Sequence, residues 1–387
     1  MNPLYAAMPT TVFEDMSARA RATGAINLGQ GFPDTGWPDD ILHAAAAALT
    51  TGSNQYPPAA GLAILREAVA AHYSSHQKLD VSADHVLVTS GATEALAASL
   101  LAILEAGDEV ILLAPMYDAY LPLVRRAGAT ARVVPLSPPE WRLPLEAIEA
   151  AVGPRTRAIV LNDPLNPAAR VFDAAEITAL AALCDRHDLL AVCDEVWEHV
   201  LFDGRRHHSL LAEPSMAKRA IKIGSAGKIF ALTGWKVGFI VADPDLLGPI
   251  GKAHQYLTFS TPPNLQSAVA YGLGKPTGYF SAMRADLQRS RDRLTGGLRE
   301  AGFVVLPSEG TYFLCVDLSA SGIDGGDTHV CHRWIEEAGL AAIPISAFYA
   351  HDGPGNIIRL CFAKHDHVID DAIGRLARWK LDAIAGA

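Results

Sequence analysis

The sequence predicts an α/β protein with a parallel sheet covered by helices on both faces, followed by a smaller α+β unit. Between residues 86 and 245, short β-branched runs alternate with longer segments rich in Ala and Leu. Apolar strands that alternate with helical segments are typical of a parallel sheet buried on both faces. After a long polar segment near residues 277–301 the strands are spaced differently, which predicts the second unit.

The elements follow from these patterns in chain order. Strands of the first block are expected at 86–88, 110–113, 131–134, 158–161, 189–192, 221–223 and 237–241, with an apolar-periodic helix from 93 to 104. In the second unit a helix of mixed charge is expected at 277–301, and strands at 304–306, 312–314 and 357–360. Because no low-complexity tract separates the two parts, we expect two domains that share an interface, where ligands commonly bind.

Composition and charge exclude several classes of partner. The 387 residues are 50% hydrophobic and 19% charged, which is typical of a globular chain rather than a disordered one. Lys+Arg 32 against Asp+Glu 42 gives a net charge of −10, and no basic run stands out. We therefore expect neither nucleic acid nor an anionic membrane surface as a partner.

Cysteines and histidines favour a cytoplasmic protein without a metal. The five cysteines are scattered and form no C-x-x-C pair, as expected for reduced thiols. No signal peptide or segment long enough to span a bilayer is visible. The His-containing fragments 329–332 and 365–367 have no partner pair at ligand spacing, so no metal site is expected.

Polar residues follow several strands at the point where each strand ends, and ligands bind at this edge of open α/β sheets. After the strand at 86–88 comes Ser-Gly-Ala-Thr-Glu at 90–94, which opens a helix. Free backbone N–H groups and the helix dipole there suit a phosphate, although a plain N-cap would have the same sequence. After the strand at 158–161 comes Asn-Asp-Pro-Leu-Asn-Pro at 162–167, a stiff turn or an ordinary Asx-Pro loop.

Two later strand ends add charged groups. Asp194 and Glu195 follow an apolar run, so the first carboxylate is either partly buried with a cationic partner or a helix cap. Lys228 follows small residues after the strand at 221–223, and Lys236 comes shortly afterwards. A lysine at a strand edge can lose its proton by desolvation and form a Schiff base, although a surface lysine is the common alternative.

Together these groups are what pyridoxal phosphate requires. The phosphate takes a helix N-terminus, a carboxylate keeps the ring nitrogen protonated, and a lysine bonds the aldehyde. A nicotinamide cofactor is disfavoured because the G-x-G in Gly-Gln-Gly-Phe-Pro-Asp at 29–34 is followed by Pro33, where a helix would have to open.

On these residues the chain resembles the fold type I pyridoxal-phosphate aminotransferases of class I/II, most of all the group with kynurenine, methionine and N-succinyldiaminopimelate aminotransferases. The resemblance runs from Asn27 to Arg359 and is most specific at 27–34, 225–228 with 233–238, and 310–313. It implies an N-terminal arm with part of the small domain at 1–45. It further implies a large domain with a mostly parallel seven-stranded sheet at 46–275 and a small α+β domain at 276–387. Pyridoxal 5′-phosphate and a homodimer with shared active sites are implied too.

The resemblance assigns catalytic roles to three residues. Lys228 would bond to the cofactor aldehyde and, once released by substrate, move the proton between the substrate Cα and the cofactor C4′ carbon. Asp194 would pair with the pyridinium nitrogen, and Tyr117 would stack on the ring.

It also assigns binding roles. The backbone at Ala92 and Thr93, together with Ser225 and Lys236, would hold the phosphate, and Asn166 would donate to the phenolic oxygen. The remaining implied contacts are Arg359 on the substrate α-carboxylate, Asn166, Gly31 and Phe32 beside the substrate, Trp197 on the cofactor, and Tyr56 reaching the phosphate of the neighbouring subunit.

Two positions depart from the family pattern. The family usually has Asp-Glu-Val-Tyr, and this chain has Trp197 at the tyrosine position. An indole N–H donates one hydrogen bond but can neither accept one nor ionise, so the proton affinity of the lysine–cofactor link is tuned differently. The usual Asn-Pro-Thr-Gly is Asn-Pro-Ala-Ala at 166–169, which predicts a differently shaped loop.

The predicted function is transfer of an amino group from an L-amino acid (aromatic, methionine- or glutamine-like) to a 2-oxo acid by a ping-pong mechanism. Two alternatives stay open, a β-lyase of cysteine conjugates that uses the same residues and a non-catalytic sensor module on this fold. Six aromatic residues could make the cleft apolar, although such residues are more often core: Phe13, Phe32, Trp37, Trp197, Tyr312 and Phe348. No second arginine for a distal carboxylate is evident, so a strict aspartate enzyme is disfavoured.

Overall fold

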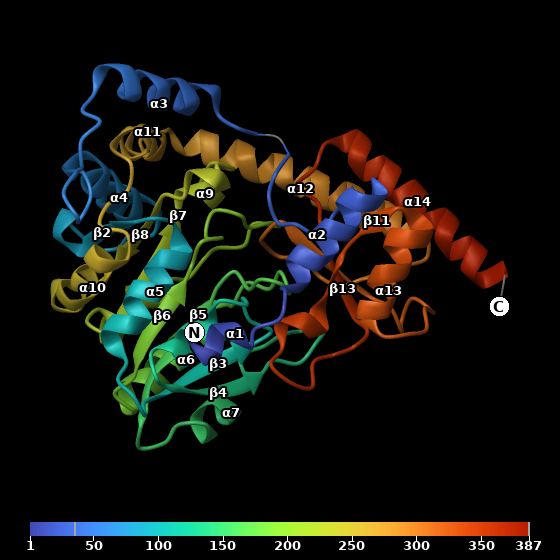
Figure 1. The fold of residues 1–387 in the computed structure, drawn as a ribbon, viewed down its shortest axis with the longest axis horizontal. Coiled ribbons are helices and arrows are strands. Elements are labelled where there is room, and N and C mark those ends of the chain that lie inside the picture. The colour runs from blue at the N-terminus through green and yellow to red at the C-terminus, as the bar shows by residue number, and fades with distance from the viewer. Residues whose placement is uncertain (35, 386–387) are drawn as a thin grey trace.

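A seven-stranded sheet forms the centre of the larger unit in the computed structural model, which describes residues 1–34 and 36–385 (Figure 1). Its strand order is β2-β8-β7-β6-β5-β3-β4. The strands are β2 (Val86–Thr89), β3 (Glu109–Ala114), β4 (Thr130–Pro135), β5 (Thr156–Asn162), β6 (Leu190–Asp194), β7 (Ala220–Ser225) and β8 (Gly238–Val241). Neighbouring strands are parallel except that β8 is antiparallel to both β2 and β7. The mostly parallel seven-stranded sheet is confirmed, while the reversed β8 was not visible in the alternation of strands and helices.

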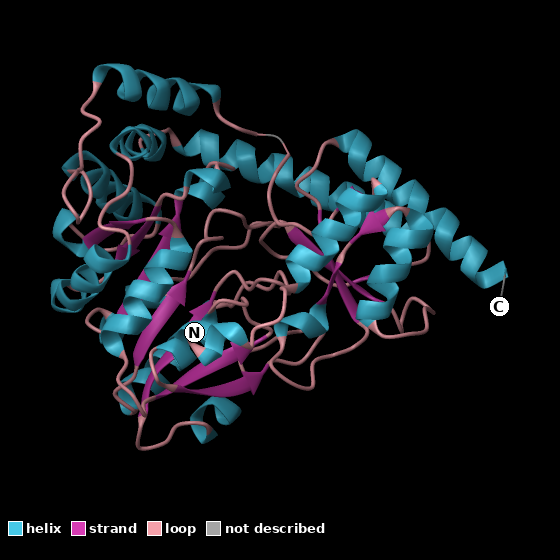
Figure 2. Ribbon diagram, in the orientation of Figure 1, coloured by secondary structure: helices cyan, strands magenta, loops and turns pink. Residues whose placement is uncertain are grey.

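Helices pack on this sheet because its strands are apolar and buried along their length. All residues of β2, β3, β6, β7 and β8 are buried. The expected helix at 93–104 is α5 (Ala92–Ile103), which packs against β6, β7 and β8. Further helices of this unit are α6 (Tyr120–Arg126), α7 (Leu145–Ala150), α8 (Ala174–Arg186) and α10 (Pro244–Leu257). Figure 2 shows these helices in cyan around the magenta strands.

The second unit is built on a four-stranded antiparallel sheet with the order β12-β13-β10-β9. Its strands are β9 (Val304–Val305), β10 (Phe313–Asp317), β12 (Ile343–Pro344) and β13 (Ile357–Cys361). Its helices are α12 (Thr277–Glu300), which matches the helix expected at 277–301, α13 (Asp327–Arg333) and α14 (Asp366–Ala385). The smaller α+β unit is therefore confirmed.

N-terminal residues belong to both units. The helix α2 (Val12–Thr23) packs against the second unit, and β1 (Ile26–Asn27) pairs in parallel with β11 (Leu340–Ala341) (Figure 1). By contrast, α3 (Asp39–Thr51) packs on α11 (Pro263–Leu273) beside α4 (Ala63–His76), at the edge of the larger unit. The boundary expected at residue 45 therefore falls inside α3. The chain begins with the short helix α1 (Pro3–Ala6), which lies against α6.

Two further observations concern the chain as a whole. Within the part of the chain that the structure describes, every helix is too short or too polar to cross a membrane. The five cysteines, all of them in described segments, are buried free thiols.

Candidate active site

Strand ends of the larger sheet meet around one cavity of about 240 Å³. Residues after β2 and β5, the last residues of β6 and β7, and the short helix α9 (Ala226–Ile229) all contribute to its lining. Because β8 is antiparallel, its first residues lie at this same edge. Of the residues predicted from the sequence, the lining includes Ala92, Thr93, Tyr117, Asn166, Asp194, Trp197, Ser225, Lys228 and Lys236.

One end of the cavity is a cradle of backbone that only small residues permit. Gly91 has φ +80° directly before α5, and a Cβ on Gly238 would lie 2.6 Å from the carbonyl carbon of Gly91 and 2.9 Å from the amide nitrogen of Ala92. The Lys236 ammonium lies 3.3 Å from the place that a Cβ on Gly91 would take. A helix N-terminus beside a lysine favours an anion, which suits a phosphate group.

Asp194 is a buried carboxylate at the end of β6 with one free oxygen. The Tyr120 hydroxyl donates to Oδ2 at 2.5 Å, whereas Oδ1 has no hydrogen-bond partner among the described residues. Burial raises the pKa of Asp194, and the Tyr120 hydrogen bond works against that rise. A buried carboxylate oxygen needs a donor, preferably a cationic one, so this oxygen fits a protonated ring nitrogen in the cavity.

Lys228 enters the cavity from α9. Its Nζ donates to the carbonyl oxygen of Gly31 at 3.3 Å and lies 4.4 Å from the centre of the Trp197 ring. Burial lowers the pKa of Lys228 to about 8, and the charges of Arg359 and Lys236 act in the same direction. A lysine with this pKa is partly neutral near physiological pH and can act as a nucleophile or a base.

Arg359 lies in the middle of β13, within the strand expected at 357–360. Its guanidinium donates to Asn166 Oδ1 at 2.9 Å and to the Gly29 carbonyl at 2.7 Å, and burial lowers its pKa to about 10. Three phenyl rings surround its Cζ, at 3.8 Å for Phe313, 5.0 Å for Phe348 and 5.4 Å for Phe13. A planar cation held in an apolar setting suits two hydrogen bonds to a carboxylate.

The remaining predicted residues are not part of the cavity lining. Tyr56 is 83% exposed with its ring edge-on to Phe259, and Phe32 is 43% exposed beside Lys364. Gly31 is a glycine for a packing reason, since a Cβ there would lie 2.3 Å from the ring of Phe313. Trp37 is exposed as well.

Sequence reasoning missed a charged network directly behind Asp194. The Lys222 ammonium, fully buried in β7, contacts the carboxylates of both Glu195 and Glu198. The Tyr73 hydroxyl donates to Glu198 at 2.6 Å, and the nearly buried side chain of His207 lies beside Glu195. Glu195, Glu198 and His207 could in principle hold a metal ion, but the Lys222 ammonium already contacts both carboxylates. In the sequence, Lys222 has the pattern of a lysine that faces solvent from a strand. Its neighbours in the chain therefore do not indicate this network.

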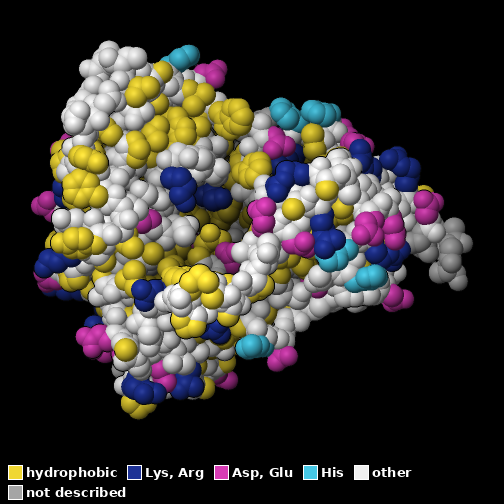
Figure 3. Space-filling view, in the orientation of Figure 1, with side chains coloured by type: hydrophobic (Ala, Val, Ile, Leu, Met, Phe, Trp, Pro, Cys, Tyr) yellow, Lys and Arg dark blue, Asp and Glu magenta, His cyan; other side chains and the backbone are white. Residues whose placement is uncertain are grey.

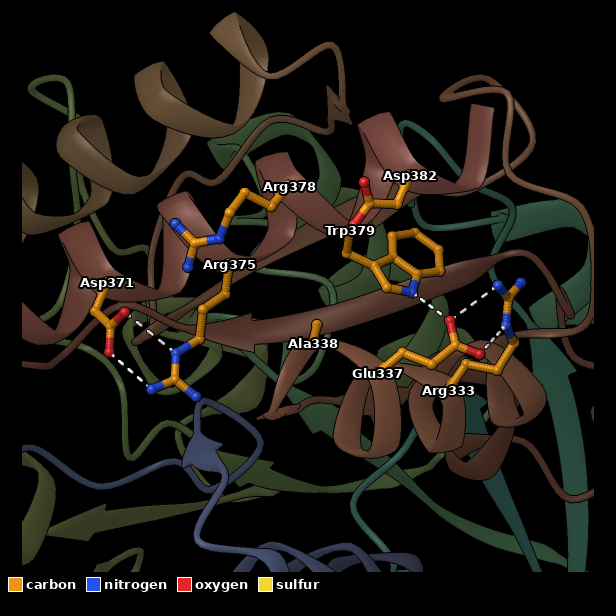
Figure 4. A pocket seen from close by; sticks show the side chains of 8 residues that line it. All are labelled: Arg333, Glu337, Ala338, Asp371, Arg375, Arg378, Trp379 and Asp382. Atoms are coloured by element: carbon orange, nitrogen blue, oxygen red, sulfur yellow. Dashed lines mark hydrogen bonds and ion pairs between the residues drawn. The ribbon is translucent and has the colours of Figure 1, made fainter. Parts of the chain in front are cut away.

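A larger surface groove of about 540 Å³ lies far from this site, between α14 and the end of α13 (Figure 4). Four of the charged groups that line it pair with each other, Arg333 with Glu337 and Arg375 with Asp371, both at 3.0 Å. The indole N–H of Trp379 also donates to Glu337, at 2.6 Å. The groove therefore presents no reactive group comparable to Lys228.

Comparison with known proteins agrees with this geometry. Residues 23–376 match the profile of the family described as Aminotransferase class I and II. The chain is 43% identical over 380 residues to a probable N-succinyldiaminopimelate aminotransferase of Mycobacterium tuberculosis, covering 95% of this chain and 96% of the relative. It is 41% identical over 369 residues to the methionine aminotransferase of Escherichia coli, covering 95% of both. The solved N-succinyldiaminopimelate aminotransferase of M. tuberculosis superimposes with a TM-score of 0.92 at 44% identity, over 95% of this chain and 97% of that one.

The chain therefore belongs to the class I and II aminotransferase family, and it is a pyridoxal-phosphate-dependent aminotransferase of fold type I. The described residues fit the cofactor of this family on two independent grounds. The glycine cradle beside α5 accommodates a phosphate, and the free Oδ1 of Asp194 faces a cavity that also holds the Lys228 amine.

Proposed function

We propose that Lys228, Asp194 and the cradle around Gly91 hold pyridoxal phosphate, and that Lys228 moves the proton in an amino-group transfer. One observation carries the proposal: the buried amine, the unpartnered carboxylate oxygen and the anion cradle all line a single cavity. When bound, pyridoxal phosphate supplies an electron-accepting ring for the electron pair left at the substrate Cα.

The residues of this chain do the remaining work. Asp194 keeps the ring nitrogen protonated, Tyr117 covers one ring face and Asn166 donates to the phenolic oxygen. Ala92, Thr93, Ser225 and Lys236 hold the phosphate. Lys228, whose pKa of about 8 leaves part of it neutral, accepts the proton from the substrate Cα and delivers it to the C4′ carbon of the cofactor.

The substrate is oriented by Arg359. Its guanidinium binds the α-carboxylate next to Asn166, while Gly31 and Phe32 lie on the loop that borders the amine. The phenyl rings of Phe13, Phe313 and Phe348 around this arginine support an apolar side chain on the amino donor. Relatives named methionine aminotransferase and kynurenine–oxoglutarate transaminase support donors of the same kind.

A coupled screen tests this function. L-methionine, L-kynurenine, L-phenylalanine, L-glutamine, L-aspartate and N-succinyldiaminopimelate serve as amino donors, each with several 2-oxo acids. We expect parallel-line, ping-pong kinetics with the apolar donors and no turnover by Lys228→Ala. Turnover that survives in Lys228→Ala overturns the assignment, and release of pyruvate and ammonia without an oxo acid indicates β-elimination instead.

We further propose a homodimer in which Tyr56 of one subunit reaches the phosphate site of the other. Large apolar side chains are exposed at the ends of α3, α4, α10 and α11, and Figure 3 shows hydrophobic side chains gathered over this side of the molecule. They include Leu49, Tyr56, Ile64, Tyr256, Leu257, Phe259 and Tyr271. Exposed apolar patches of this kind mark interfaces between proteins.

We also propose a cellular location and a division into domains. Five free, buried thiols support a reducing compartment, in accordance with the cytoplasm. For the domains we propose an arm at 1–38, a large domain at 39–275 and a small domain at 276–387; the first boundary moves from 45 to 38 because α3 begins at Asp39 and packs on α11.

A further inference from the structure

Trp197 lies three residues after Asp194 and is only 3% exposed. Its ring is held edge-to-face by Tyr312, with centroids 4.7 Å apart, and by Phe313 at 5.6 Å. These contacts fix the indole so that Lys228 Nζ lies 4.4 Å above the ring. The segment after β6 therefore supplies both the carboxylate at 194 and an aromatic face for the amine.

The Lys228 ammonium has little other stabilisation. In the part of the chain that the structure describes, its hydrogen-bond acceptor is the Gly31 carbonyl at 3.3 Å, a long contact. The Tyr312 hydroxyl does not serve it, because that group donates to the backbone carbonyl of Lys228 at 2.8 Å. The face of the Trp197 ring is the second group that contacts the Lys228 ammonium.

Charged and titratable groups from several neighbouring elements also act on this amine. Asp194 on β6 favours its charged form, whereas Arg359 on β13 and Lys236 before β8 disfavour it. Cys361 on β13 lies nearby and favours the charge when ionised, but burial raises the pKa of its thiol, so it stays neutral near pH 7. Burial raises the pKa of Tyr312 far above its usual value, so this hydroxyl stays neutral too.

We propose that Trp197 is a positioning residue for Lys228, whose indole face stabilises the ε-ammonium and keeps it pointed into the cavity whenever the amine is free of the cofactor. The inference rests on the proposed role of Lys228 and goes beyond it. An indole has the strongest cation-binding face of the aromatic side chains. Because it can neither accept an ordinary hydrogen bond nor ionise, it holds the charged amine without competing for its proton.

Competitive labelling of the full-length chain tests the proposal before cofactor is added. Trace acetic anhydride is applied between pH 5 and 11, and mass spectrometry quantifies the peptide that carries Lys228, with exposed Lys252 as internal standard. We expect a labelling midpoint near pH 8 for the natural chain. Trp197→Phe keeps an aromatic face, so its midpoint falls by no more than roughly 0.3 units. Trp197→Met and Trp197→Leu, two non-aromatic replacements of different shape, lower it by roughly 0.5 to 1 unit.

Trp334→Phe is the matched control, since Trp334 is a fully buried indole in the second unit. It should leave the midpoint of Lys228 unchanged. A structural role alone for Trp197 would lower the melting temperature without moving the midpoint. The proposal is overturned if a folded Met or Leu variant keeps the natural midpoint, or if the Phe variant shifts as far as they do.

Borohydride reduction of the cofactor-loaded natural chain separates this proposal from the proposed function. If no cofactor is trapped on Lys228, the proposed function fails, while the labelling midpoints still report on the contact between Trp197 and the amine. If cofactor is trapped and the midpoints do not move, only the role of Trp197 fails.

Discussion

The Tyr120 hydroxyl donates a hydrogen bond of 2.5 Å to Oδ2 of Asp194, and both side chains are buried. The bond fixes the carboxylate so that its other oxygen, Oδ1, is the one left for a ligand. Tyr120 comes from the start of α6 and Asp194 from the end of β6, so two separate elements define the direction of one oxygen.

Replacing Tyr120 by Phe should weaken cofactor binding. The hydrogen bond opposes the rise that burial causes in the pKa of Asp194, so its loss raises that pKa further. A hydrogen bond to a charged group is worth about 1.5–3 kcal/mol, which corresponds to roughly a 10- to 100-fold weaker Kd for pyridoxal phosphate. Fluorescence titration measures the Kd. Tyr349→Phe is the control, because its hydroxyl donates to the Leu136 carbonyl, which is not part of the cavity lining. An unchanged Kd in Tyr120→Phe contradicts the prediction.

The pKa of Lys228 predicts the pH dependence of cofactor attachment. Burial lowers this pKa to about 8, and only the neutral amine attacks an aldehyde. The rate of attachment to the cofactor-free chain should therefore rise about tenfold per pH unit well below pH 8 and flatten above it. Stopped-flow absorbance at a fixed cofactor concentration measures the rate. A profile that keeps rising to pH 10 would show an ordinary, solvated lysine.

Arg359→Lys should impair substrate binding and leave the cofactor in place. Lysine keeps the charge but loses the planar pair of donors that matches a carboxylate. We expect kcat/KM for the amino donor to fall by roughly 100-fold, most of it in KM, since two charge-assisted hydrogen bonds are changed. The absorbance spectrum of the bound cofactor should stay the same. A spectrum altered to the same degree as KM would instead place Arg359 in cofactor binding.

Lys222→Met should destabilise the fold, because Glu195 and Glu198 lose their buried counter-ion. Breaking a buried ion pair costs about 3–5 kcal/mol. In the natural chain burial raises the pKa of Glu195, whereas at Glu198 burial is outweighed by Lys222 together with His207 and Tyr73, so the pKa of Glu198 is lowered. Without Lys222, the pKa values of Glu195 and Glu198 in the folded chain both lie above their values in the unfolded chain. The folded state then favours the protonated carboxyl groups. The difference in the free energy of unfolding between the natural chain and Lys222→Met should therefore grow as pH rises from about 5 to 8.

Urea unfolding at several pH values measures this effect, with exposed Lys218→Met as control. Adding Glu198→Gln to Lys222→Met should recover part of the loss, since one unpaired charge is removed. A deficit that does not vary with pH would contradict the assignment.

A charge in the exposed apolar patch should prevent the proposed dimer. Tyr256, on α10, is 87% exposed in the isolated chain. Tyr256→Glu would bury a carboxylate in the interface, so we expect a monomer with little activity, because Tyr56 of the second subunit is then missing. Sedimentation velocity measures the mass. Leu381→Glu, on the outer surface of α14, should stay dimeric and active. A natural chain that sediments as a monomer overturns the dimer itself.

Most of the larger unit was predictable because its strands are continuous apolar runs and polar residues stand where those runs end. Lys228 and Asp194 could be predicted for that reason, and Asn166 from its place in a double X-Pro turn. Lys222 could not, because a lysine in a strand faces solvent in most proteins, and Tyr120 could not, because the sequence does not show which group a helical tyrosine contacts. Their burial depends on how β7 pairs with β6 and on how α6 packs against α5, β3 and β4, which no short stretch of sequence records. The reversed β8 was missed for a similar reason, since a four-residue apolar strand has the same pattern in either direction.

The hydrogen bond from Arg359 to Asn166 joins the four-stranded sheet to the loop after β5 of the seven-stranded one. A substrate whose carboxylate binds that guanidinium, and whose nitrogen lies beside Lys228, contacts both units at once. If Arg359 binds the substrate as proposed, substrate binding adds a link between the two units, and product release removes that link.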